Sequence, residues 1–209
     1  MADIPPPIKT KELHICYQPI SKLYNDDCGH FPIRSRSGND YIIIAYHCDL
    51  NTILQAPFSN RENKHRIRSY NSIMKRLDDQ WHQVGVQILD NKVSAEFKQS
   101  IVDYWGATYQ LVPPNVHRIN IAERSICNFK ANFLSVIAVV DPEFYKFMWD
   151  NLFFQTDLTL NLICQATLNP CILAWEYLNS AFDYVATPLG PIRCRLVIHI
   201  TSKNRKSCD

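Results

Sequence analysis

The sequence is poor in several features that define whole classes of proteins. Only five of its 209 residues are glycine, which argues against a glycine-rich loop that cradles phosphate groups. It has no Cys-x-x-Cys pair, so the usual zinc-finger spacing is missing. No apolar run approaches the length that spans a bilayer. These absences disfavour phosphate-loop proteins, zinc fingers and membrane anchoring.

The amino terminus and the net charge also carry little signal. The start Met-Ala-Asp-Ile-Pro-Pro-Pro has neither the basic nor the apolar region of a secretion signal. We therefore expect an intracellular protein, not a secreted one, whose eight cysteines are reduced. A formal net charge of +2 is too small to indicate a nucleic-acid partner by itself. Any basic binding surface must be local.

In the first part of the chain, polar turn-forming segments alternate with strand-like apolar runs. Residues 1–13 contain three consecutive prolines and are expected to form a disordered tail. Strands are predicted at 14–27, 41–46 and 51–58, and their short links favour an antiparallel meander. A helix with basic flanks follows. Its apolar positions recur at helical spacing and are Ile67, Tyr70, Met74, Leu77 and Trp81.

The remaining elements complete an α/β pattern. They are a strand at 84–89, a helix at 94–105 that stops at Gly106, a strand at 108–112, a helix from about 120, a helix from 142 toward 164, a short helix at 174–178 and a strand at 194–200. This element order is that of the ribonuclease H-like fold. We expect a mixed five-stranded sheet flanked by helices over residues 14–140. A helical extension, ending in a short strand and a basic tail, is expected over 141–209.

Three acidic residues occupy distinctive positions in this order. Asp26 would lie on the first strand, Asp90 directly after the fourth, and Glu123 in the helix after the fifth. Neighbouring strand ends and a helix packed across them can bring such side chains together. Carboxylate oxygens suit hard cations such as Mg²⁺ or Mn²⁺. The three acids are therefore predicted to be catalytic residues that hold metal ions.

Several short motifs around these acids resemble a known family. They are Asp26-Asp27-Cys28-Gly29-His30-Phe31-Pro32, Leu89-Asp90-Asn91, Gln110-Leu111-Val112-Pro113-Pro114 and Asn120-Ile121-Ala122-Glu123-Arg124. Together they resemble the catalytic core of retroelement integrases, in particular the integrase segment of LTR-retrotransposon polyproteins of the copia type. The resemblance covers about residues 22 to 200.

The resemblance implies DNA end processing and joining to target DNA, with two Mg²⁺ or Mn²⁺ ions on Asp26, Asp90 and Glu123. It also implies DNA and further copies of the chain as partners, and a nuclear location when functional. No membrane and no small-molecule cofactor are expected. Residues placed to grip nucleic-acid phosphates are His117, Arg118, Arg124 and Lys130.

The assignment of the three acids has alternatives. Asp27 competes with Asp26, since alternation along a strand lets only one of them face the site. Asp49 competes as a member of the triad, but it precedes a predicted β-turn, where Asp is common as a turn former. Glu123 follows Asn120 at the spacing of a capping box, in which its carboxylate would bond the helix start.

Two other functions remain open from the sequence. Lys92 puts a positive charge two residues after Asp90, and cysteines stand where the family usually has other residues. Both are features of a catalytically decayed remnant that still binds nucleic acid or assembles. A nuclease for RNA/DNA hybrids shares the fold but usually needs a fourth carboxylate, for which the chain offers no convincing candidate.

Overall fold

A five-stranded mixed sheet forms the centre of the protein. The computed structural model describes residues 21–112, 121–187 and 189–190. The strands are β1 (Lys22–Gly29), β2 (Tyr41–His47), β3 (Thr52–Phe58), β4 (Val86–Leu89) and β5 (Thr108–Leu111), in the order β3-β2-β1-β4-β5. The first three strands are antiparallel, and β4 and β5 run parallel to β1. This confirms the predicted mixed sheet.

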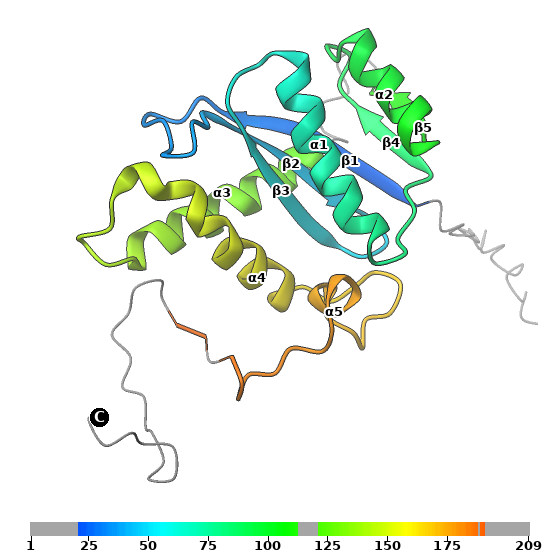
Figure 1. Cartoon of the computed structure of the whole chain (residues 1–209). Helices are drawn as coiled ribbons and strands as arrows, with labels where there is room; N and C mark the ends of the chain where they lie inside the picture. Colours follow the sequence, from blue (N-terminus) through cyan, green and yellow to red (C-terminus); the bar gives the residue numbers. More distant parts are fainter. Residues whose placement is uncertain (1–20, 113–120, 188, 191–209) are drawn as a thin grey trace, which may run out of the picture.

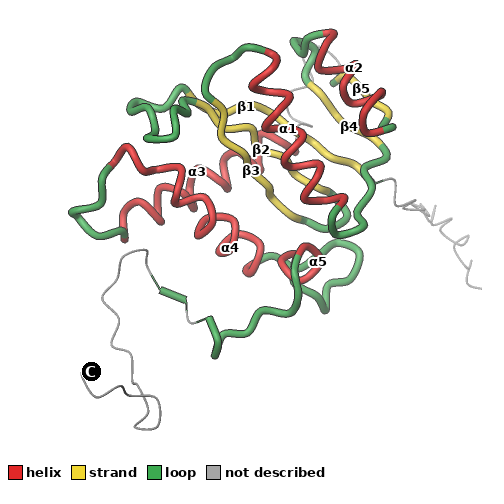
Figure 2. Tube along the Cα trace, in the orientation of Figure 1, coloured by secondary structure: helices red, strands yellow, loops and turns green. Residues whose placement is uncertain are grey.

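Helices cover both faces of the sheet (Figures 1 and 2). The helical elements are α1 (Asn63–Asp78), α2 (Ala95–Trp105), α3 (Ile121–Val139), the 3-10 helix η2 (Lys146–Leu152), α4 (Phe153–Ile163) and α5 (Ala174–Leu178). In Figure 1, α1 crosses one face of the sheet, and α3 lies on the other. The apolar side chains of α1 and α2 share one core cluster, and those of α3, η2 and α4 share a second.

Strand β2 explains why both faces are covered. Its side chains from Ile42 to Ala45 are all buried. Because side chains alternate along a strand, Ile43 and Ala45 enter the α1 cluster while Ile42 and Ile44 enter the α3 cluster. Full burial of each isoleucine contributes on the order of 2 kcal/mol. A continuous apolar strand therefore requires helices on both sides.

The edge strand β3 is sealed by α4. The Asn161 side chain accepts the Ile53 N–H at 3.0 Å and donates to the Ile53 carbonyl at 3.1 Å, as a neighbouring strand would. Asp157, one turn earlier, forms an ion pair of 2.7 Å with Arg76 of α1. These contacts satisfy edge groups that could otherwise pair with another chain, and they connect the helices of the two faces.

The predicted ends of two elements are wrong. Strand β1 continues to Gly29, because its pairing with β2 extends that far. Helix α1 ends at Asp78, so Trp81 is not part of its apolar stripe. Instead, the Trp81 backbone has φ 62° and its side chain is 93% exposed. The predicted strand at 194–200 and the tail at 1–13 lie outside the described residues.

The helix predicted to begin at Pro142 starts later. The Asp141 carboxylate accepts the Glu143 N–H at 2.8 Å, and the Asp141 carbonyl accepts the Phe144 N–H at 2.8 Å. This closes a single turn, and helical structure resumes only with η2 at Lys146. An aspartate followed by proline can start either a helix or an isolated turn, and here it forms the turn.

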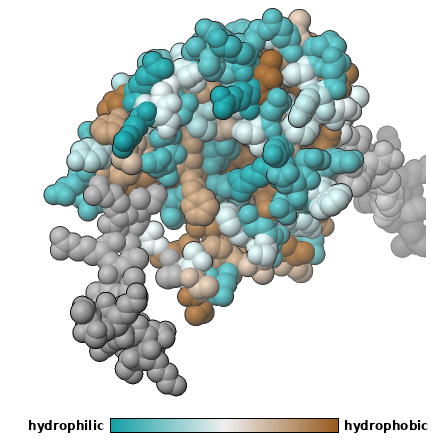
Figure 3. Space-filling model, in the orientation of Figure 1, coloured by the Kyte–Doolittle hydropathy of each residue, from teal (hydrophilic) through white to brown (hydrophobic). Residues whose placement is uncertain are grey.

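The surface shown in Figure 3 is mixed. Hydrophilic residues predominate over α1 and α2, while apolar residues gather lower in the view, near α4 and α5. Exposed apolar side chains of that region include Phe154, Ile163 and Leu168. Scattered exposed apolar residues are normal for a folded protein.

Candidate metal site

Asp26 and Asp27 face opposite sides of β1. Cys28 belongs to the core cluster of α3, so Asp26, two residues earlier, faces α3 as well. Asp27 points to the other face, where its carboxylate lies 3.1 Å from the Arg66 guanidinium of α1. Of the two aspartates, Asp26 therefore has the orientation that the predicted site requires, and Asp27 forms an ion pair.

Asp90 lies beside Asp26 at the same level of the sheet. β1 and β4 are parallel, and their last paired residues are Tyr24 and Ile88. Asp26 and Asp90 each come two residues later, so the two carboxylates leave adjacent strands at equal height and toward the same face. Asp90 is exposed, directly after the last residue of β4. The strand ends thus place two acids side by side.

Asn91 holds the chain in place after Asp90. Its backbone N–H donates to the Asp90 carboxylate at 2.7 Å, and its side-chain amide donates to the Val112 carbonyl at 2.6 Å. The second bond ties the end of β4 to the segment after β5. The Asp-Asn pair thus has a structural basis, because the amide fixes the backbone that carries the acid.

Glu123 enters from α3. It lies in the first turn of the helix and is exposed, and Ile126 and Phe129 bury the adjoining face of α3 against the sheet. Burial raises the pKa of Asp26, and the negative charges of Asp90 and Glu123 raise it further, against a lowering by the Asp27 N–H bond. Asp26 therefore interacts electrostatically with both other acids.

The three acids form an open arrangement. Across the described ranges, no three His, Cys, Asp or Glu side chains are grouped closely enough to hold a metal ion. The donor set itself fits a hard divalent cation, since it consists of carboxylates alone. The mutual repulsion felt by Asp26 is also what a bound cation would offset. Asn120, the other half of the possible capping box, lies outside the described residues.

Two of the four predicted nucleic-acid-binding residues lie within the described part of the chain, and Lys130 is close to this site. Burial raises the pKa of the Cys28 thiol, while Lys130, within hydrogen-bonding reach, lowers it. Lys130 is therefore beside the face of β1 that carries Asp26. Arg124 is exposed and acts electrostatically on Tyr46 of β2, whose pKa burial raises to about 12. His117 and Arg118 lie outside the described residues.

Asp49 is not near the other acids. It lies in the turn after β2, where its carbonyl accepts the Leu168 N–H at 3.0 Å. β2 is antiparallel to β1, with His47 opposite Leu23 and Ile44 opposite Asp26. The turn thus lies near the start of β1, toward the end of the sheet opposite Asp90. The turn-forming role expected for Asp49 is what the structure shows.

Arg66 is a residue of this region that the sequence reading missed. Arg66 is one of the basic residues of α1, and its side chain is only 16% exposed. Its guanidinium lies 4.9 Å from the centre of the Phe97 ring and lowers the pKa of both Asp26 and Asp27, against the raising effect of their burial. The signal was its spacing, four and seven residues before buried Tyr70 and Ile73.

The comparisons with known proteins agree with this architecture. No family model matches the sequence, and no curated protein does. A chain of the simian T-cell lymphotropic virus intasome, solved in complex with the PP2A regulatory subunit B56 gamma, superposes with a TM-score of 0.59 over 87% of this protein at 14% identity. The fold is that of integrase catalytic cores.

A second integrase structure supports this fold. The catalytic core domain of BIV integrase matches 75% of this protein with a TM-score of 0.53 at 10% identity, and 92% of that domain is covered. The protein spans 60% of the matched intasome chain. The ribonuclease H-like fold predicted from the element order is thereby confirmed.

Of the helices in the described part of the chain, none is long and apolar enough to cross a membrane.

Proposed function

We propose that this protein is an integrase-type polynucleotidyl transferase core, which processes DNA ends and joins them to target DNA. The observation that carries the proposal is the shared position of Asp26 and Asp90 on adjacent parallel strands, with Glu123 acting on Asp26 from α3. The integrase fold is consistent with it. The motif resemblance adds an origin in an LTR-retrotransposon of the copia type.

The chemistry follows from the ligands that this site offers. Two Mg²⁺ or Mn²⁺ ions held by Asp26, Asp90 and Glu123 would activate the attacking hydroxyl or water and stabilise the leaving oxygen. Asp90 is fixed by the Asn91 backbone, and Asp26 by the sheet. Glu123 is on a separate helix, so its approach would complete the ligand set. Lys130 and Arg124 would hold DNA phosphates beside these acids.

We also propose DNA and further copies of the chain as partners. Two features support this choice: the intasome chain to which the protein is similar, and the basic side chains beside the acids. His117 and Arg118 belong to the same proposed phosphate-binding set. We propose a nuclear location for the active protein, because its substrate would be chromosomal DNA.

The proposal is tested by end processing and strand joining on duplex DNA with Mg²⁺ or Mn²⁺. Wild-type protein should be active, and Glu123→Gln should lose about 100-fold or more, since it removes a ligand needed for the reaction. Glu96→Gln is the matched control, because Glu96 also lies in the first turn of an exposed helix. Folded wild-type protein with no more activity than Glu123→Gln would rule out the enzyme.

A DNA-binding remnant without catalysis is the second candidate. It is favoured by the open arrangement of the described acids and by the exposed Lys92, two residues beyond Asp90. Such a protein would bind duplex DNA with a salt-dependent affinity, and Glu123→Gln would leave that affinity unchanged. Cleavage of an RNA/DNA hybrid in preference to duplex DNA would instead indicate a hybrid nuclease.

A further inference from the structure

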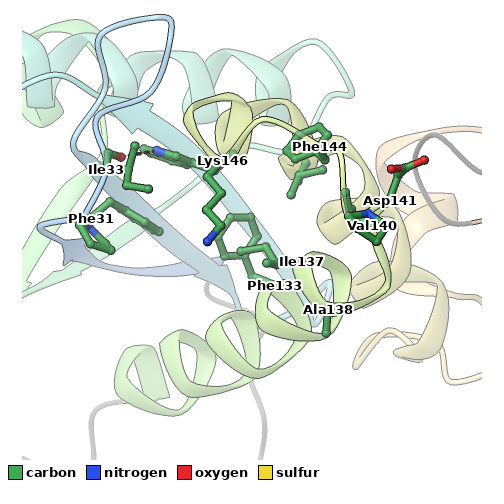
Figure 4. Close-up of a pocket in the computed structure, with 13 residues that line it drawn as sticks. Phe31, Ile33, Phe133, Ile137, Ala138, Val140, Asp141, Phe144 and Lys146 are labelled. Atoms are coloured by element: carbon green, nitrogen blue, oxygen red, sulfur yellow. Dashed lines mark hydrogen bonds between the residues drawn. The ribbon is translucent and has the colours of Figure 1, made fainter.

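A cavity of about 410 Å³ lies on the α3 side of the sheet and contains none of the three acids. Its walls come from four segments: residues 31–33 after β1, the second half of α3, the turn at 140–144, and η2 (Figure 4). The volume is within the range of small-molecule sites, which are concave and mostly apolar with a few polar groups. The cavity therefore has the dimensions of a ligand site.

The walls are held in place by contacts within the protein. The Phe31 and Trp149 rings stack at 4.2 Å, and the Trp149 indole N–H donates to the Ile33 carbonyl at 2.7 Å. Phe133, which is 4% exposed, meets Phe31 edge to face at 6.0 Å. A ligand would therefore enter a preformed space without first ordering its walls, which reduces the entropic cost of binding.

One side chain gives the cavity a positive charge. Lys146 is the single lysine or arginine of its lining, and in Figure 4 its nitrogen extends toward Phe133 of α3. Asp141 also lines the cavity, but its carboxylate accepts the Glu143 N–H at 2.8 Å and points away from Lys146. No ion pair of Lys146 occurs within the described part of the chain. The charged end of Lys146 thus lies beside the apolar walls of the cavity.

We infer that this cavity binds a small amphipathic anion, with an apolar ring or chain and one carboxylate or sulfonate group. The apolar part would lie against Phe31, Phe133 and Trp149, where it leaves water. The acidic group would accept a charge-assisted hydrogen bond from Lys146. This inference is independent of the proposed DNA chemistry, because it uses none of the residues assigned to that site.

A pair of fluorescent probes tests the charge requirement. 8-Anilinonaphthalene-1-sulfonate carries one sulfonate, and N-phenyl-1-naphthylamine has the same rings without it. Lys146→Met should weaken binding of the sulfonate probe about tenfold, as expected for one lost charge-assisted bond, and change the neutral probe less than about twofold. Lys75→Met, on exposed α1 across the sheet, is the charge-matched control and should change neither.

A second pair of variants tests the location. Ile137, which is 43% exposed, lines the cavity from α3, so Ile137→Trp should fill the space and weaken both probes. Leu134→Trp is the control, because Leu134 lies one turn earlier and is absent from this lining. Unchanged sulfonate-probe binding in Lys146→Met or in folded Ile137→Trp overturns the inference. Equal weakening of both probes by Lys146→Met also overturns it.

Discussion

Asp26 and Asp27 are chemically identical neighbours with different surroundings. Within the described residues, Asp26 interacts with two other acids and forms no ion pair, whereas Asp27 lies 3.1 Å from Arg66. Substituting either one by asparagine keeps the shape of the side chain and removes its charge. The two substitutions should therefore separate function from stability.

We expect Asp26→Asn to abolish metal-dependent activity without lowering stability, because it removes a carboxylate that its neighbours repel. Asp27→Asn should instead lower the free energy of unfolding by about 2 kcal/mol, since it leaves the Arg66 charge partly buried without its partner. Urea unfolding with a parallel DNA-joining assay measures both. If Asp26→Asn proved the more destabilising of the two, their orientations would have been assigned the wrong way round.

His47 predicts how stability depends on pH. The side chain is 2% exposed, and burial lowers its pKa from 6.5 to about 4. Its Nδ1 accepts the Leu50 N–H at 3.4 Å, which requires the neutral ring, and Nε2 lies 2.9 Å from the Ser21 hydroxyl. Because the unfolded state takes up the proton first, this contribution is complete above pH 6.5 and is lost as the pH falls toward 4.

The full contribution of His47 corresponds to about 3 kcal/mol of unfolding free energy. Urea unfolding at pH 7 and pH 4.5 should show a fall in wild type that is smaller in His47→Gln. The comparison needs the variant, because the raised pKa values of Asp26 and Asp157 act in the opposite direction over acidic pH. Parallel pH profiles for the two proteins would show that His47 does not titrate in this window.

At the scale of secondary-structure elements, the chain adopts a left-handed backbone conformation after two helices, once at a glycine and once at a tryptophan. α2 ends at Gly106 with φ 63°, and a Cβ there would meet nothing within 4 Å. Trp81, after α1, holds φ 62° with its side chain in solvent. Non-glycine residues pay about 1 kcal/mol in this left-handed region.

Gly106→Ala should therefore lower the unfolding free energy by about 1 kcal/mol, and Trp81→Gly should raise it by a similar amount. Thermal and urea unfolding of the two variants measure the pair. Because Trp81 is almost fully exposed, little packing is lost with its side chain. A destabilised Trp81→Gly protein would mean that the indole makes a contact outside the described residues.

These ends also show why some boundaries were predictable. For α2, Ser94 accepts the Phe97 N–H and Gly106 closes the other end, so both signals are local residues. After α1, an apolar Trp81 continued the helical spacing although the chain had already turned. Asp141 made the same side-chain bond that a helix start would make. A local sequence pattern predicts an element correctly where only one backbone conformation is compatible with it. The prediction fails where two conformations are compatible with the same pattern.

At the scale of the whole molecule, strand order brings distant acids together. The sequence predicted that Asp26 and Asp90 would lie at neighbouring strand ends, because the order of strands and helices along the chain indicates which strands are adjacent in the sheet. The approach of Glu123 depends on how α3 packs, which no local pattern encodes. Arg66 was missed because its partner Asp27 is distant in sequence. Prediction thus reached the elements that carry the site but not its side-chain contacts.

A bound cation should stabilise the whole fold. Asp26 is destabilised by the charges of Asp90 and Glu123, and a divalent ion that binds only the folded state raises its stability. At a Mn²⁺ concentration about ten times the dissociation constant, the melting temperature should rise by about 3–5 °C relative to protein in EDTA.

Asp26→Asn and Glu123→Gln should each show a smaller rise, while Glu96→Gln should respond like wild type. Calorimetric titration with Mn²⁺ then gives the affinity directly. Equal shifts in all four proteins would place the bound cation elsewhere, and the three carboxylates would lose their assignment as its ligands.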